Sequence, residues 1–339
     1  MTDLNHAVPA TMQGVVVLEP GGVEQLKLVD LPTPPPGRGE VLIRVHAAGV
    51  NRPDVLQRLG LYPPPPDANP RLGLEVAGDI VAVGEGVGQE RLGNAVMALC
   101  NGGGYSEYVV VPAAQCMSVP PGLTMVQAAS LPEVYLTVWQ NLVWTGGLKA
   151  GAKVLVHGGS SGIGTAAIQL CKRFGAEVFV TVGGPAKASY CEALGAKTYH
   201  YKTEVWEDRI LADTEGVGVD LVLDMVAGDY LDRDLKCVAD QGKIIVIALL
   251  GGRFAKIDGA RLMAKRAELT GNTLRPRSAQ FKARLCAEVE QDLAAGFASG
   301  HYKPLVEAVY PLQQVARAHT RMESGESFGK IVLKIGESE

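Results

Sequence analysis

A chain of 339 residues is long enough for two domains, each with its own hydrophobic core. Hydrophobic residues make up 47% of it and charged residues 20%, which is typical of a globular enzyme and argues against disorder. The formal net charge is −4, and the scattered lysines and arginines form no basic block, so nucleic acid and anionic membranes are not expected partners.

The beginning of the chain and its apolar runs point away from secretion and from membranes. Residues 1–14 contain no basic segment followed by an apolar one, so we expect no signal peptide. The longest apolar run of note, Ile244 to Leu250, is far too short to span a bilayer. We expect a cytoplasmic protein whose residues 1–11 form a loose leader.

The first third of the chain is predicted to be β structure. In Gln13–Ala98, short apolar strands are broken by glycine and proline, which predicts a barrel-like sheet. Four consecutive prolines, Pro63–Pro66, favour an extended conformation and predict a stiff surface arm that carries Tyr62. The glycine-rich turn Asn101–Gly104 precedes a further strand, Tyr105–Val111.

The periodicity then changes. Met125–Leu142 has helical spacing interrupted at Pro132, and strands alternate with helices from Ala152 onward. This alternation predicts a parallel sheet with helices on both faces. The last segment, about 278–339, returns to β character and is expected to complete the first domain. The predicted elements of the alternating part are strand 153–157, helix 163–174, strand 177–182, helix 186–194, strand 198–201, strand 219–226, helix 229–239, strand 243–249 and strand 268–274.

A glycine-rich loop separates the first strand and helix of this alternating part. The spacing Gly159-x-x-Gly162-x-Gly164 differs from the G-x-G-x-x-G fingerprint, so a simple tight turn is one interpretation. However, the loop follows a buried strand and opens an amphipathic helix, whose free N–H groups suit a phosphate. This context favours dinucleotide binding.

The second strand of the unit predicts which dinucleotide binds. In units that prefer NAD, an Asp or Glu about 20 residues past the glycine turn holds the ribose 2′-hydroxyl. Here the strand Glu177–Val182 is followed by Gly183-Gly184-Pro185-Ala186-Lys187, without an acid. Lys187 can pair with a 2′-phosphate, although a solvated lysine at a helix start is the alternative. We expect NADPH in preference to NADH.

Five stretches carry a resemblance to a known family. They are AAGVNRPDVLQRLGLYPPPP, LGLEVAGDIVAVG, LPEVYLTVWQNL, VLVHGGSSGIGTAAIQL and SFGKIVLKI. Together they resemble the zinc-free quinone oxidoreductases of the medium-chain dehydrogenase/reductase superfamily, and most closely the tumour-suppressor-inducible NADPH quinone reductase branch. The resemblance covers Gln13–Ile335. It implies an α/β fold with a GroES-like β-barrel catalytic domain (1–131 and 278–339) and a Rossmann domain with a doubly wound parallel sheet (132–277), which binds NADPH.

The chain departs from zinc-dependent members of that superfamily. They carry Cys where this chain has Asn51, His where it has Leu74, and a further Cys near Glu133. Glu133 alone cannot build a tetrahedral zinc site, and the six cysteines include no C-x-x-C pair for a structural one. We therefore expect no metal. Without a Lewis acid to stabilise an alkoxide, hydride donation to a quinone or a conjugated enone is easier than alcohol oxidation.

The resemblance also implies residue roles. Asn51 and Tyr62 would donate hydrogen bonds to the acceptor oxygen, with Tyr62 as the better candidate for proton relay; a turn-stabilising Asn and an exposed aromatic are the alternatives. Close relatives often have Ser where this chain has Gly184, so the selectivity for NADPH is expected to be weaker here. The expected cofactor contacts are Thr137 (nicotinamide amide or a phosphate), Gly159, Ser160, Ser161, Gly162, Ile163 and Gly164 (pyrophosphate), Lys187 and Tyr201 (2′-phosphate and its ribose), Leu249, Thr273 and Leu274 (nicotinamide), and Lys330.

Three functions remain open at this point. An NADPH:quinone reductase is the leading interpretation, and an enoyl or alkenal reductase would use the same hydride on a different small-molecule acceptor. A protein that binds NADPH as a redox sensor, or one that binds RNA, is the non-enzymatic alternative. The strand Glu268–Leu274 is expected at a sheet edge, where in this family it pairs with its mate in a two-fold homodimer.

Overall fold

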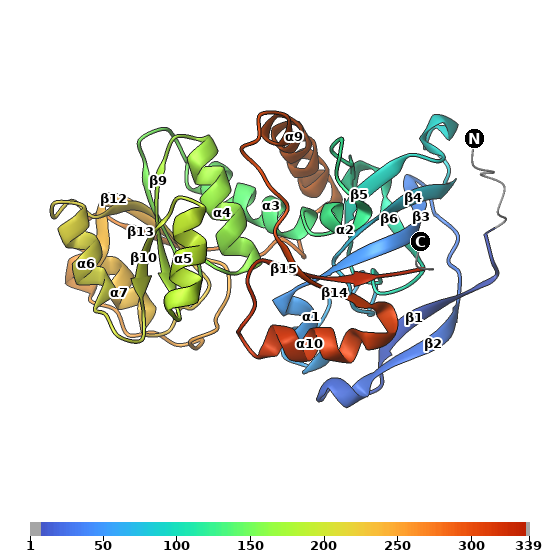
Figure 1. Ribbon diagram of the computed structural model, residues 1–339, viewed down its shortest axis with the longest axis horizontal. Helices are drawn as coiled ribbons and strands as arrows, with labels where there is room; N and C mark the ends of the chain where they lie inside the picture. Colours follow the sequence, from blue (N-terminus) through green and yellow to red (C-terminus); the bar gives the residue numbers. More distant parts are fainter. Residues whose placement is uncertain (1–7, 337–339) are drawn as a thin grey trace. The chain divides into compact units, whose positions relative to one another are not determined.

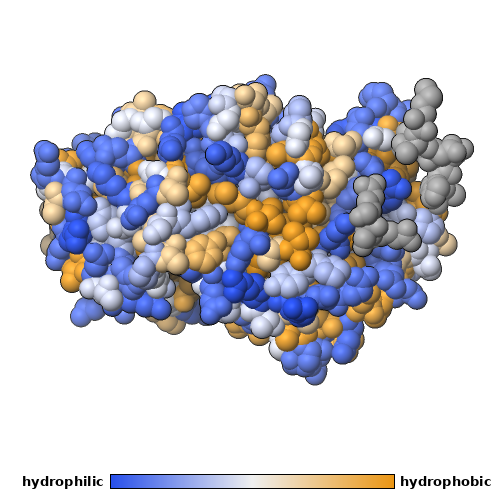
Figure 2. All heavy atoms as spheres, viewed as in Figure 1, coloured by the Kyte–Doolittle hydropathy of each residue, from blue (hydrophilic) through white to orange (hydrophobic). Residues whose placement is uncertain are grey.

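The computed structural model describes residues 8–336, which form two compact units. Unit 1 contains the chain up to Glu133, Arg275–Phe297 and the chain from Pro304; unit 2 contains Val134–Leu274 and Ala298–Lys303. Most of the predicted leader lies outside the described residues, and the first strand begins at Thr11. No helix within residues 8–336 is both long and apolar enough to cross a membrane. The face drawn in Figure 2 has hydrophilic residues interspersed with hydrophobic ones.

The described part of unit 1 is built on a seven-stranded sheet, with a separate ribbon of two antiparallel strands. Strand β15 pairs antiparallel with β3, so the C-terminal segment completes a sheet that begins near the N-terminus. Apolar side chains of β3, β4 and β15 fill the core. The ribbon is β1 (Thr11–Val17) and β2 (Leu26–Pro32), and the sheet contains β3 (Glu40–Val50), β4 (Glu75–Val83), β5 (Ala95–Leu99), β6 (Tyr108–Pro112), β7 (Cys116–Ser118), β14 (Val306–Pro311) and β15 (Lys330–Lys334).

Helices complete unit 1. They are α1 (Arg52–Arg58), α2 (Met125–Ala128), most of α9 (Ala279–Ala298) and α10 (Val315–Glu323). Helix α1 was not predicted from the sequence. It begins because the carboxylate of Asp54 accepts a hydrogen bond from the backbone N–H of Asn51, and because a proline stands in its first turn.

Unit 2 is a six-stranded parallel sheet in its described part, in the order β10-β9-β8-β11-β12-β13. Counted along the chain this order is 3-2-1-4-5-6, that of a Rossmann sheet. Helices flank the sheet on both sides (Figure 1), which confirms the predicted doubly wound fold. Its strands are β8 (Lys153–Val156), β9 (Glu177–Val182), β10 (Lys197–His200), β11 (Val219–Asp224), β12 (Val238–Val246) and β13 (Glu268–Gly271).

The helices of unit 2 differ in part from the prediction. The predicted helical stretch 125–142 is divided into α2, then α3 (Pro132–Val138), which crosses from unit 1 into unit 2, and a π-helix at Trp139–Thr145. Two short helices, α6 (Trp206–Asp213) and α8 (Gly259–Ala264), were missed. The others are α4 (Gly162–Arg173), α5 (Pro185–Ala193) and α7 (Tyr230–Cys237).

Candidate functional site

A buried network of three side chains joins three strand ends of unit 1. Asn51 follows β3, Glu75 opens β4 and Lys330 opens β15. The antiparallel registers, which pair Val50 with Ile331 and Ala48 with Val76, bring these ends together. The three side chains are 6%, 0% and 5% exposed, respectively.

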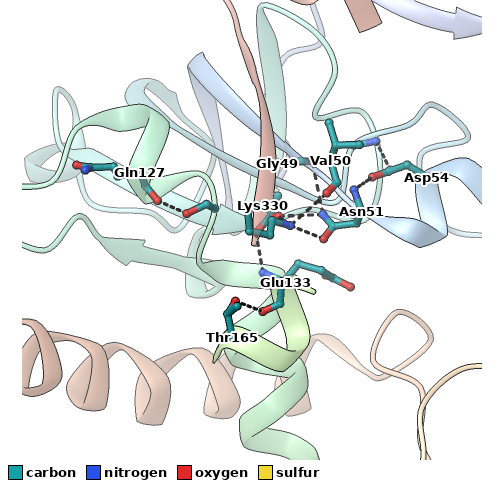
Figure 3. A network of polar contacts seen from close by, with 12 residues as sticks. Gly49, Val50, Asn51, Asp54, Gln127, Glu133, Thr165 and Lys330 are labelled. Atoms are coloured by element: carbon teal, nitrogen blue, oxygen red, sulfur yellow. Dashed lines mark hydrogen bonds and ion pairs between the residues drawn. The ribbon is translucent and has the colours of Figure 1, made fainter. Parts of the chain in front are cut away.

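Hydrogen bonds connect Asn51 and Lys330 to each other and to their neighbours (Figure 3). The Lys330 ammonium donates to Asn51 Oδ1 at 2.5 Å, to Glu75 Oε1 at 2.6 Å and to the Val50 carbonyl at 3.3 Å. Asn51 Nδ2 in turn donates to Glu75 Oε1 at 2.8 Å. The ion pair compensates two buried charges, and it fixes which end of the Asn51 amide faces which partner.

The sequence analysis expects Asn51 to bind the acceptor oxygen and Lys330 to contact the cofactor. Both side chains make hydrogen bonds within unit 1. The Lys330 amine is bound by three acceptors of unit 1, and one N–H of Asn51 is taken by Glu75. The partner that the sequence analysis missed is Glu75. A signal for it existed, because a glutamate inside the apolar strand LGLEVAG needs a buried partner.

The family resemblance places the ligands of zinc-dependent members at Asn51, at Leu74 and near Glu133. Leu74 is buried and offers no donor atom, and the ammonium of Lys330 lies against Asn51. An ammonium at 2.5 Å from one of the remaining oxygens would repel a divalent cation. The donor set therefore does not fit tetrahedral zinc.

A second group of polar side chains in unit 1 contains Tyr62, Glu133 and Arg275. The guanidinium carbon of Arg275 lies 5.8 Å from the centre of the Tyr62 ring. Burial, reinforced by the charge of Glu133, raises the pKa of Tyr62, against the opposing effect of Arg275. Burial and the neighbouring charge of Glu75 raise the pKa of Glu133 to about 8, although Lys330 opposes this shift. Glu133 is thus mainly a neutral acid at pH 7.

Asp54 is a buried carboxylate that connects three segments of unit 1 by hydrogen bonds. Its carboxylate accepts hydrogen bonds from the backbone N–H groups of Asn51 and Gly73, both at 2.9 Å, and from the Tyr105 hydroxyl at 3.1 Å. Burial raises the pKa of Asp54 to about 6, while these hydrogen bonds act in the opposite direction. Asp54 holds the start of α1, and with it Asn51, in place.

The glycine loop of unit 2 lies between β8 and α4, as predicted. The Ser161 side chain caps α4 by accepting a hydrogen bond from the Gly164 N–H at 3.0 Å. Gly158 has φ +68°, a conformation that other residues rarely adopt, and a Cβ on Gly164 would lie 2.4 Å from the Gly159 carbonyl oxygen. The loop is therefore tightly folded at the N-terminus of a twelve-residue helix.

Four buried polar groups support this loop. His157 Nε2 lies 2.8 Å from Asp234 Oδ1, and His157 Nδ1 lies 3.0 Å from the Thr181 hydroxyl, which also accepts from the Gly158 N–H at 3.3 Å. Asp224 accepts from the backbone N–H groups of the residues that follow it. Ligand atoms of His157, Asp224 and Asp234 lie within 4.8 Å of one another, but these hydrogen bonds already occupy much of their capacity.

The other predicted cofactor contacts of unit 2 follow the carboxyl ends of its strands or lie on α3. Tyr201 comes directly after β10, and its N–H donates to the carbonyl of Val182, the last residue of β9. Its hydroxyl lies over Gly183. Gly184 is the N-cap of α5, the helix that carries Lys187. A Cβ at Gly184 would have no other atom within 4 Å. Carboxyl ends of parallel strands are where α/β proteins bind ligands. The remaining predicted contacts are Leu249 beyond β12, Thr273 and Leu274 beyond β13, and Thr137 on α3.

Two known domain families match parts of the chain. The model for an alcohol dehydrogenase GroES-like domain matches residues 37–121, and that for a zinc-binding dehydrogenase matches residues 162–290. Fold and matches together define an oxidoreductase with a nucleotide-binding domain. The chain belongs to the medium-chain dehydrogenase/reductase superfamily, within its zinc-free quinone oxidoreductase family. Its predicted place in the tumour-suppressor-inducible branch stays a prediction.

Similar proteins differ in what their names say they do. The human quinone oxidoreductase is 32% identical over 326 residues (95% of this chain and 97% of the relative), and the rat synaptic vesicle membrane protein VAT-1 homolog is 33% identical over 336 residues (93% and 82%). Among solved structures, a mycobacterial protein complexed with NADPH has a TM-score of 0.85 at 31% identity (95% of this chain and 100% of that one). An NAD-dependent alcohol dehydrogenase has 0.84 at 31% (96% and 100%), and the CurK enoyl reductase has 0.85 at 27% (97% and 100%).

Proposed function

We propose that the protein reduces quinones by hydride transfer from NADPH without using zinc. The observation that carries this proposal is the hydrogen bond of the Lys330 ammonium to Asn51, at a position where zinc-dependent relatives hold a metal ligand. A site with a fixed cation but no open metal coordination suits an acceptor that spreads its own negative charge. The kinship with the human quinone oxidoreductase supports the same acceptor class.

The choice of NADPH rests on the tip of β9. No carboxylate follows this strand, and Lys187 and Tyr201 are the groups proposed to hold the 2′-phosphate and its ribose. The loop Gly159–Gly164 is proposed to hold the pyrophosphate at the N-terminus of α4. The other proposed cofactor contacts are Thr137, Leu249, Thr273, Leu274 and Lys330.

Asn51 and Tyr62 are proposed to bind the acceptor oxygen. Asn51 keeps one amide N–H beyond the one that Glu75 takes, and that N–H has only a long 3.5 Å contact with the Gly49 carbonyl. Because the pKa of Tyr62 is raised, its phenol is a hydrogen-bond donor and a weak acid. Water supplies the final proton when Tyr62 does not.

An enoyl or alkenal reductase is the second candidate, and the likeness to the CurK enoyl reductase favours it. Steady-state assays with naphthoquinones and 2-alkenals, with either NADPH or NADH, separate the candidates. We expect the quinones to be reduced at the higher kcat/KM, with NADPH preferred. Faster reduction of alkenals would make alkenals, and not quinones, the acceptor class. A preference for NADH would overturn the assignment of NADPH as the cofactor. Binding of NADPH without turnover of any acceptor would favour a redox sensor.

We also propose a cytoplasmic homodimer. Strand β13 lies at an edge of the parallel sheet, and the segment that leads to it exposes Phe254 (82%) and Met263 (80%). Pairing of β13 with its mate would cover this open edge. Sedimentation equilibrium tests this, and a monomer at micromolar concentration would contradict it.

A further inference from the structure

Arg275 is a buried cation with unused hydrogen-bonding capacity. Its side chain is 8% exposed. One guanidinium nitrogen, Nη1, donates to Gln57 Oε1 at 2.7 Å. The other two, Nε and Nη2, are buried and have no partner among residues 8–336. Leaving buried donors unpaired is costly, and more so on a charged group, so the arrangement calls for an explanation.

The surroundings of Arg275 hold it in position. Its backbone carbonyl accepts a hydrogen bond from the buried Lys282 ammonium at 2.7 Å, and Lys282 also donates to Asn101 Oδ1 at 2.6 Å. Tyr62 covers one side of the guanidinium with its ring. Tyr62 belongs to residues 59–74, which contain neither helix nor strand, and a ligand that reaches this side of the guanidinium has to displace its ring.

The other polar groups of the site are less suited to receive a negative charge. Lys330 already donates to three acceptors, and the amide of Asn51 is partly taken by Glu75. Unlike them, Arg275 has two guanidinium nitrogens, Nε and Nη2, whose N–H groups have no partner among the described residues, and it is a permanent cation next to Tyr62. An oxygen that gains charge between Tyr62 and Arg275 would satisfy donors that no residue in 8–336 satisfies.

We propose that Arg275 is a catalytic residue, whose free N–H groups bind the acceptor oxygen on which negative charge develops during reduction. This inference rests on the proposed function and adds the group that stabilises the anion. It also defines the acceptor as one whose reduction places a full negative charge on oxygen, such as a quinone.

The charge balance explains why such a group is needed. NADPH supplies a hydride, that is, one proton and two electrons. The hydride would leave the nicotinamide with the electron pair of its C–H bond and form an O–H bond on one quinone oxygen; the two carbonyl π bonds then reorganise into the aromatic ring, and the second oxygen is left with the negative charge. Arg275 and Tyr62 stabilise this hydroquinone monoanion, and one proton from water or from Tyr62 then gives the neutral hydroquinone. Donors aimed at a developing oxyanion typically contribute about 10²–10³-fold in kcat.

The test compares Arg275→Gln with Arg277→Gln, an exposed arginine two residues away. We expect Arg275→Gln to lower kcat for a naphthoquinone by about 100-fold with little change in KM, while Arg277→Gln stays within about twofold of the wild type. We expect added guanidinium at low concentration to restore part of the activity of Arg275→Ala, which a merely structural role would not allow. Unchanged kcat in Arg275→Gln would overturn the proposal.

A measurement without NADPH tests the same point at equilibrium. 4-Nitrophenol bound to the protein is a stable mimic of the monoanion, and its absorbance reports its ionisation. We expect bound 4-nitrophenol to ionise at lower pH than in water in the wild type and in Arg277→Gln, but not in Arg275→Gln. An equal ionisation in all three proteins would overturn the role of Arg275, whereas absence of turnover of every quinone by the wild type would overturn the proposed function alone.

Discussion

The Lys330 ammonium lies 2.6 Å from the Glu75 carboxylate, and both side chains are almost fully buried. This ion pair joins the first residue of the C-terminal strand β15 to the first residue of β4. Because Asn51 lies against both groups, the pair sets the orientation of its amide. Closure of the sheet by its last strand thus also completes the candidate site.

Breaking this pair from one side is expected to be costly. Lys330→Met leaves the Glu75 carboxylate buried without its counter-charge, and such changes cost about 3–5 kcal/mol. The double variant Lys330→Met/Glu75→Gln removes both charges and is expected to recover a large part of that loss. Urea unfolding of the two single variants and the double variant measures the coupling. Additive losses would contradict the buried pairing.

The Thr181 hydroxyl is expected to matter for dinucleotide binding. Thr181→Val keeps the shape of the side chain but removes the oxygen that contacts His157 and the Gly158 N–H. Thr181→Ser keeps that oxygen and serves as the matched control. We expect Thr181→Val to weaken NADPH binding about tenfold, because the Gly158 N–H of the loop loses this hydrogen-bond acceptor. Thr181→Ser is expected to remain within about threefold of the wild type.

Fluorescence titration with NADPH measures these dissociation constants. Circular dichroism melting reports whether the fold of each variant is intact. Equal affinities of Thr181→Val and Thr181→Ser would mean that the position of the loop does not depend on this hydroxyl.

Local patterns in the sequence predicted most of the fold. The strands of unit 2 and the glycine loop were predicted because buried β-branched runs and helix-opening glycines are local signals. Helix α6 was missed because its buried residues include a charged one, Glu207, and only two apolar ones, Trp206 and Ile210. Strand β12 begins at Val238, whereas the sequence predicted a start at 243. Residues 238 and 239 belong to this strand and not to the predicted helix 229–239.

The candidate site was harder to predict because its partners are distant in the sequence. Glu75 and Lys330 are 255 residues apart, and only the register of β15 on β3 brings them together. Arg275 carried no local signal at all. Its unpaired N–H groups become visible only once Gln57, Tyr62 and Lys282 are placed around it. Asn51 and Tyr62 were proposed from the family resemblance, and their roles stay predictions.

Gly184 offers a way to strengthen the expected preference for NADPH. The position is extended (φ 173°), and a Cβ there would meet no atom within 4 Å, so a side chain is tolerated. We expect Gly184→Ser to raise the preference for NADPH over NADH about three- to tenfold by adding a hydroxyl donor for the 2′-phosphate. Gly184→Ala controls for the backbone, and Lys187→Ala is expected to lower the preference. Ratios of kcat/KM for the two cofactors measure the effect. Equal ratios for Gly184→Ser and Gly184→Ala would mean that the 2′-phosphate does not bind next to residue 184.

Glu133 is expected to make stability depend on pH. Its pKa in the folded protein is about 8, above the value of about 4.3 for an unfolded glutamate, so the folded state binds the extra proton between these values. The contribution of this group to stability is therefore full below about pH 4 and is lost as the pH rises through 8. Glu133→Gln cannot ionise, so its melting temperature relative to the wild type should rise from pH 5 to about pH 8 and level off above that pH. Thermal melts at intervals of one pH unit measure this difference, with Glu90→Gln on the protein surface as the control. A difference that stays constant with pH would mean that Glu133 is ionised in the folded protein at neutral pH.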